Sequence, residues 1–153
     1  MASPTPGVPP PAASIASAPL PPVVIDASVW VARFVPSDRF HVTSAAWLRA
    51  QIRGRRALIS PNVLLPELAG SVARVLNDMG LGLAAARSLT RLSVVRLVPL
   101  DASLARQAYT VAATARLKGA DAVYVALAQQ LGVPLISWTG EQVARAGAVT
   151  PSP

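Results

Sequence analysis

Three of the seven acidic residues in this 153-residue chain stand where an apolar segment begins or ends. Asp26 directly follows the run VVI, Glu67 follows Pro66, and Asp121 starts the stretch DAVYVALA. Taken singly, Asp26 reads as a turn or cap residue, and the other two read as acids favoured near a helix N-terminus. More specific chemistry follows only if the three side chains converge.

The position of Asp121 argues for convergence. Val125 and Ala128 continue its face of the expected helix at i+4 and i+7, so this face points into the protein. A carboxylate turned toward an apolar core is costly unless a cation or hydrogen-bond donors compensate it. Carboxylates at strand ends and helix starts can meet at one edge of a sheet, where Mg²⁺ or Mn²⁺ suits an all-oxygen site. We therefore predict a divalent-cation site formed by Asp26, Glu67 and Asp121.

Several other chemistries are excluded by composition. The chain has no cysteine, so it contains neither disulfides nor thiolate metal sites. His41 is the single histidine, which rules out any site that needs two. No G-x-S-x-G turn is present to display a nucleophilic serine.

The remaining four acids have ordinary interpretations, with one exception. Asp38 falls in an expected loop, Asp78 near a helix end, and Asp101 at the N-cap of a helix after a strand. Glu141 lies just past the last long strand, and its role stays open.

The elements that must position these residues alternate between strand and helix. Strands are expected at 23–25, 57–60, 94–100 and 134–138, with Val149 in a short last one. Helices are expected at 29–34 after a Ser28 cap, at 43–53, within 61–79 with Pro66 in the first turn and Gly80 at the end, at 83–92, from Asp101 to about 117, and from Asp121 to Leu131 after a break at Gly119. Short apolar strands alternating with helices predict an α/β protein with a parallel sheet covered on both faces.

The organisation along the chain is simple. Residues 1–22 are rich in proline, alanine and serine and carry no charge, so we expect a disordered leader followed by one domain over 23–150. The leader lacks a basic n-region and a continuous apolar h-region. No apolar run is long enough to span a bilayer, and the absence of cysteine is compatible with a cytoplasmic location.

The formal net charge of +7 favours a polyanionic partner such as nucleic acid, although heavy arginine usage in a GC-rich genome would give the same balance. The segment RAQIRGRR (49–56) could follow an RNA backbone or form a solvated helix end. The tryptophans could stack on bases, or they could pack in the core or at an interface; they are Trp30, Trp47 and Trp138.

Three stretches together carry a family resemblance: VVIDASVWV, PELAGSVARV and RLKGADAVYVALAQQLGVPLISW. In this order and spacing, over roughly residues 23–150, they resemble the PIN-domain ribonucleases, and more narrowly the VapC-type toxins of toxin–antitoxin modules. The resemblance implies a three-layer α/β/α fold and Mg²⁺-dependent endoribonuclease activity. It also implies an antitoxin partner and a homodimer. By position, Asp26, Glu67 and Asp121 are similar to the family's metal-binding acids, and Ser28 matches a hydroxyl residue often found beside them.

The sequence departs from the family's pattern after the fourth strand. Where members often have an acid, as in TWD, this chain has Thr139 in the stretch SWTGE. Thr139 can hydrogen-bond a metal-bound water but carries no charge. A catalytically weak module that acts by binding RNA or an antitoxin is therefore the alternative to an active nuclease.

Overall fold

A four-stranded parallel sheet lies at the centre of the molecule, with the strand order β3-β2-β1-β4. The strands are β1 (Val23–Ile25), β2 (Leu58–Pro61), β3 (Val95–Val98) and β4 (Leu135–Ile136). Val149 extends the sheet by one parallel bridge to Ile136, as predicted. This computed structural model describes residues 20–152. Residues 1–19 of the leader predicted at 1–22 therefore lie outside the described residues.

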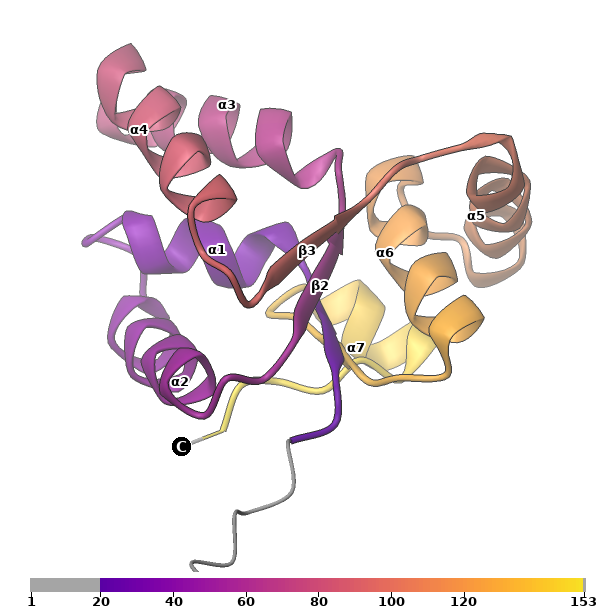
Figure 1. Cartoon of the computed structure of the whole chain (residues 1–153). Helices are drawn as coiled ribbons and strands as arrows, with labels where there is room; N and C mark the ends of the chain where they lie inside the picture. Colours follow the sequence, from indigo (N-terminus) through magenta and orange to yellow (C-terminus); the bar gives the residue numbers. More distant parts are fainter. Residues whose placement is uncertain (1–19, 153) are drawn as a thin grey trace, which may run out of the picture.

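Helices cover both faces of the sheet. They are α1 (Ala27–Phe34), α2 (His41–Arg53), α3 (Leu64–Leu76), α4 (Met79–Thr90), α5 (Ala102–Ala115), α6 (Gly119–Leu131) and α7 (Gly140–Ala146). Figure 1 shows α1 to α4 on one side of the strands, and α5 and α6 on the other. This arrangement confirms the predicted three-layer α/β/α fold. No helix within residues 20–152 is long and apolar enough to cross a membrane.

The core is built around β1 and α6. All three residues of β1 are fully buried, as expected for a central strand of a sheet covered on both faces. In α6, seven consecutive residues from Ala122 to Ala128 are buried, because this helix lies between the sheet and α5. A helix that is apolar on all sides requires such a position. The predicted inward direction of Val125 and Ala128 is confirmed.

Two predicted helix boundaries on the α1–α4 side are wrong. Asp26, not Ser28, caps α1: its side chain accepts a hydrogen bond from the Ser28 backbone N–H, which places Ser28 inside the first turn. The helix predicted to end at Gly80 ends at Leu76. Asn77 supplies the left-handed residue after it (φ 51°), since asparagine tolerates that conformation. Asp78 then caps α4, which contains Gly80.

The start of α6 and the whole of α7 also differ from expectation. Gly119 does not break the chain before α6 but begins the helix, and Asp121 is its third residue. Lys118 occupies the N-cap position without a side-chain hydrogen bond, so Asp121 is not an N-cap. Helix α7 was not predicted, because its sequence GEQVARA is short and has a weak apolar pattern. Asp101 caps α5 as predicted, with its side chain accepting from Leu104 N.

Candidate metal-binding active site

The predicted acids reach one edge of the sheet from three different segments. Asp26 follows β1, Glu67 lies in the first turn of α3 after β2, and Asp121 lies in the first turn of α6. Parallel strands direct their carboxyl ends to the same edge, where ligands bind in open α/β sheets. A cavity of about 500 Å³ opens there. Its lining includes all five predicted site residues: Asp26, Ser28, Glu67, Asp121 and Thr139.

Asp26 is the most tightly held of the three acids and is only 3% exposed. Its Oδ2 accepts hydrogen bonds from Ser28 N (2.9 Å), Ser137 Oγ (3.3 Å) and Thr139 Oγ1 (3.5 Å). Its Oδ1 accepts one from Gln142 Nε2 (3.1 Å). Four donors fix both carboxylate oxygens, which compensates the burial of this acid.

Ser28 and Trp138 tie the start of α1 to the end of β4. The Trp138 backbone N–H donates to Ser28 Oγ at 3.0 Å, so the Ser28 hydroxyl positions this loop. The Trp138 ring stacks on Phe40 with centroids 3.9 Å apart, and its indole N–H donates to Ser44 Oγ at 2.7 Å. Trp30 and Trp47 are buried in the core. The packing interpretation of the tryptophans is therefore the one that the structure supports.

Glu67 is paired with a tyrosine from the opposite layer. The Tyr124 hydroxyl donates a hydrogen bond to Glu67 Oε2 at 2.5 Å, which joins α6 to α3. Burial raises the pKa of Glu67, the tyrosine hydrogen bond lowers it, and the negative charges of Asp26 and Asp121 raise it further. The same surroundings raise the pKa of Tyr124, chiefly through burial, so its hydroxyl stays protonated and donates.

Asp121 lacks such support. Its carboxylate makes no hydrogen bond to another side chain among the described residues. Burial raises the pKa of Asp121 and the charge of Asp26 raises it further, while Lys118 lowers it and Glu141 raises it. Burial is the main cause of both raised pKa values, and the neighbouring negative charges add to it.

The arrangement fits a hydrated divalent ion better than a closed shell of protein ligands. Within residues 20–152, no three His, Asp or Glu side chains are close enough to hold one ion directly. The salt bridge found in the described part of the chain joins Arg145 to Glu141, so no cationic side chain lies within 4.0 Å of the cavity carboxylates. Mg²⁺ commonly binds through one or two carboxylates and keeps several waters, which suits this spacing.

Sequence reasoning missed three residues that hold the acids: Tyr124, Ser137 and Gln142. Tyr124 is i+3 from Asp121, a spacing that could have suggested it. Ser137 and Gln142 carry no such signal, because their contacts depend on β4 and α7 returning to Asp26. Asp38, interpreted as an ordinary loop acid, also lines the cavity.

Glu141 does not line the acidic cavity, and its half-exposed side chain pairs with Arg145 at 3.8 Å. It acts on the site at longer range, since its charge contributes to the raised pKa of Asp121.

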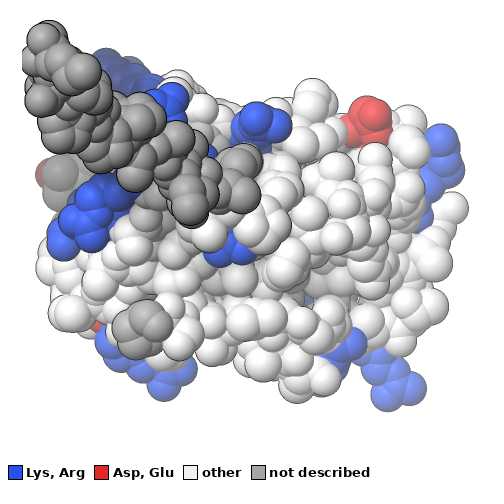
Figure 2. Space-filling model, turned by 60° about the horizontal axis from the view of Figure 1, so that its bottom comes forward, with Lys and Arg blue, Asp and Glu red and all other residues white. Residues whose placement is uncertain are grey.

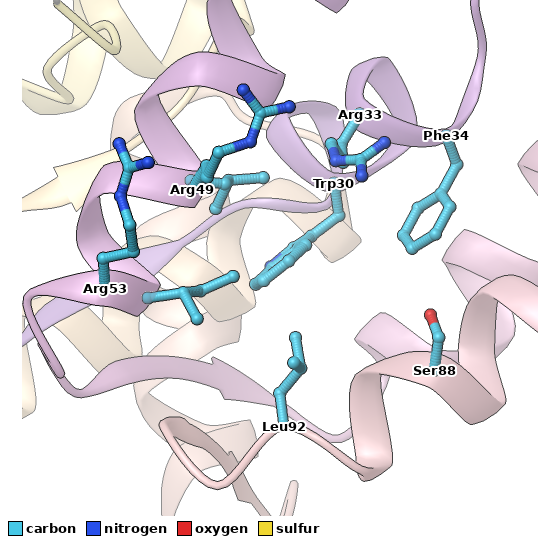
Figure 3. A pocket seen from close by; sticks show the side chains of 9 residues that line it. Trp30, Arg33, Phe34, Arg49, Arg53, Ser88 and Leu92 are labelled. Carbon is cyan, nitrogen blue, oxygen red and sulfur yellow. The ribbon is translucent and has the colours of Figure 1, made fainter.

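A second pocket lies on the other face of α1. Ala27, Ser28 and Val31 line the acidic cavity, whereas Trp30, Arg33 and Phe34 line a pocket of about 340 Å³ against α2 and α4. Figure 3 shows three arginine side chains around it, with an apolar floor; they are Arg33, Arg49 and Arg53. The arginines of the segment 49–56 therefore point to different places. Arg49 and Arg53 line this pocket, whereas Arg56 donates to Pro21 O and to Gln51 Oε1.

The sequence profile of the family described as PIN domain matches residues 23–149, and the chain belongs to this family. Its fold is also that of solved toxin structures. VapC20 of Mycobacterium tuberculosis, described as a sarcin–ricin loop cleaving toxin, superposes with a TM-score of 0.73 at 23% identity, covering 86% of this chain and 99% of that one.

Two further structures share the fold. A toxin–antitoxin complex from Klebsiella pneumoniae has a TM-score of 0.63 at 19% identity, covering 85% of this chain and 98% of the other. FitAcB from Neisseria gonorrhoeae has a TM-score of 0.60 at 18% identity, covering 85% and 96%. A comparison with curated protein sequences gives no match.

Proposed function

We propose that this PIN domain is a Mg²⁺-dependent endoribonuclease, with Mn²⁺ as an alternative ion, and that it acts as the VapC-type toxin of a toxin–antitoxin module. The observation that carries the proposal is the convergence of Asp26, Glu67 and Asp121 on one cavity at the carboxyl edge of the sheet. The raised pKa values of Glu67 and Asp121 support it, because carboxylates that are partly buried and close to other negative charges favour a cation.

In this proposal, one or two of the three acids bind the ion directly, and the others act through its waters. The bound ion supplies charge neutralisation at the scissile phosphate and lowers the pKa of a bound water. Asp26 serves as the fixed ligand, since four hydrogen bonds hold its carboxylate in place. No histidine is required as a base.

Glu67 is the residue best placed to take the proton of the attacking water. Tyr124 occupies Glu67 Oε2, which leaves Oε1 without a partner among the described residues. Burial raises the pKa of Glu67, and a carboxylate with a raised pKa accepts a proton more readily than an ordinary glutamate does. Arg74, which also lines the cavity, can contact a phosphate of the RNA backbone.

The charge distribution is compatible with an RNA substrate. Figure 2 shows basic side chains spread around the edges of one face, where acidic side chains are few. Together with the net charge of +7, this supports attraction of a polyanion without defining a single binding track.

The proposed partners are a cognate antitoxin and a second copy of the chain. The structure of the same fold from Klebsiella pneumoniae is a toxin–antitoxin complex. In this chain, the pocket in Figure 3 combines an apolar floor with three arginines that form no ion pair among the described residues, which suits an acidic amphipathic segment. Exposed apolar side chains near the α3–α4 turn support self-association; they are Val75, Met79 and Leu81.

A catalytically weak binding module remains the second candidate, because Thr139 stands where family members often have an acid. Thr139 Oγ1 lies 3.5 Å from Asp26 Oδ2, so it contributes at most a weak hydrogen bond in place of a charge. Metal-dependent cleavage separates this candidate from the nuclease.

The experiment is a cleavage assay with purified protein, in Mg²⁺ and in chelator, on total RNA and on an oligonucleotide of the sarcin–ricin loop. Asp26→Asn and Asp121→Asn should each abolish Mg²⁺-dependent cleavage and relieve growth arrest on expression. Asp101→Asn is the matched control, since Asp101 caps α5 away from the cavity. Full cleavage by either site variant would refute the assignment of the metal-binding acids.

A further inference from the structure

Gln142 is a fully buried polar residue on an otherwise largely exposed helix, α7. Its amide Nε2 donates to Asp26 Oδ1 at 3.1 Å and to the backbone oxygen of Asp121 at 3.2 Å. One side chain therefore joins the end of β1 to the first turn of α6, the two segments that carry two of the proposed metal-binding acids.

The orientation of the Gln142 amide follows from its neighbours. A carboxylate and a backbone carbonyl are both hydrogen-bond acceptors, so only the NH₂ end of the amide can satisfy them. The reverse orientation would place an amide oxygen against two other oxygens. Gln142 thus contributes two donors and no negative charge to the back of the acidic cavity.

The hydrogen bonds of Asp26 show what the Gln142 donor controls. Oδ2 is occupied by donors from Ser28, Ser137 and Thr139, whereas Oδ1 accepts from Gln142 alone. A carboxylate oxygen has two acceptor sites, so Oδ1 keeps one for a further ligand. Gln142 is the only described side chain that fixes this oxygen.

The other end of the amide argues against a purely structural role. Gln142 Oε1 is buried and has no hydrogen-bond partner among the described residues. A buried acceptor without a partner is costly, and an apolar side chain of similar size would avoid that cost. The residue is therefore poorly suited to packing alone, and its two donated hydrogen bonds are what distinguish it from leucine.

We propose that Gln142 is a positioning residue of the metal site: it fixes Asp26 Oδ1 and holds the first turn of α6 at a set distance from it. This inference rests on the proposed function, in which Asp26 and Asp121 bind the ion. Because the amide is neutral, it connects the two acids without adding a negative charge to the cavity.

The test compares Gln142→Leu with wild type by isothermal titration of Mg²⁺ and Mn²⁺ into the full chain, together with melts in chelator. Loss of a residue that orients a metal ligand commonly lowers metal affinity by about 10–100-fold, which is the expected rise in Kd. The melting temperature in chelator should change little, because the substitution removes the unpaired Oε1 of Gln142 and leaves Asp26 Oδ1 without its donor in exchange. Gln130→Leu, the same change on the exposed end of α6, should leave Kd unchanged.

The outcomes separate this inference from the proposed function. Equal metal affinity for Gln142→Leu and wild type overturns the positioning role alone, whereas absence of binding by wild type overturns the metal site and the positioning role together. A lower melting temperature with an unchanged Kd would show that Gln142 acts only in packing. Gln142→Met, which is unbranched and fits the same space, replaces the leucine variant if that protein does not fold.

Discussion

Asp121→Asn joins stability to function and tests the centre of the proposal. The substitution removes one negative charge from the cavity and keeps the shape of the side chain. Asp121 is not the N-cap of α6, so no capping hydrogen bond is lost. The opposing cost is the favourable interaction of an acid with the helix dipole, about 0.3–1 kcal/mol. Since burial and Asp26 both raise the pKa of Asp121, the variant in chelator should be more stable than wild type.

Added Mg²⁺ should reverse this order. An ion that binds only the folded state stabilises it by mass action, by about 1.4 kcal/mol at ten times Kd and about 2.7 kcal/mol at one hundred times Kd. For a domain of this size, that corresponds to a rise in melting temperature of roughly 3–10 °C. Asp121→Asn should show much less of this rise, because one of the three proposed ligands has lost its charge.

The assay is a set of thermal melts of both proteins, with Mg²⁺ and with chelator. Asp101→Asn makes the same chemical change at a helix N-terminus outside the cavity and should respond to Mg²⁺ as wild type does. Equal Mg²⁺-induced shifts in wild type and Asp121→Asn would refute the reasoning and leave Asp121 as an acid that serves only the helix.

Further predictions concern the departure from the family pattern, the pH dependence and the leader. Thr139→Asp should lower the Mg²⁺ concentration needed for half-maximal cleavage, and Glu141→Gln should change it little; the reverse pattern in a Mg²⁺ titration would show that Glu141 has taken the role of the missing acid. In chelator, the Asp121 carboxyl favours the folded state of wild type while it is protonated, because its pKa is raised on folding. This stability is fully present below the pKa of the unfolded chain, about 3.9, and is lost as the pH rises through the pKa of the folded protein. The advantage of Asp121→Asn over wild type in melting temperature should therefore be small near pH 4 and grow toward pH 7, and a constant difference would contradict this. Deletion of residues 2–21 should preserve the melting temperature and cleavage, because the hydrogen bond that it removes, from Arg56 to Pro21 O, is exposed to solvent. A marked fall in melting temperature would show that this segment packs on the domain.

The sequence was sufficient to predict the fold class, because the spacing of apolar residues along a short segment indicates whether it forms a strand or a helix and whether it is buried. The run VVI, the alternation of short apolar strands with helices, and the all-apolar stretch after Asp121 allow only a covered parallel sheet. Asp26 and Asp121 could be singled out for the same reason, since an acid next to a segment built for burial requires a partner. Asp101 as a cap was also predictable, because capping depends on the nearest residues alone.

The tertiary structure decided the contacts that hold the acids in place. Asn77 and Asp78 ended one helix and began the next where Gly80 looked like the terminator, since two adjacent cap residues left no loop between them. Gln142 and Tyr124 reach Asp26 and Glu67 across separations of 116 and 57 residues. No local pattern encodes such pairs: they exist only because β4, α6 and α7 fold back onto the carboxyl edge of the sheet, where the chain brings distant donors to Asp26 and Glu67.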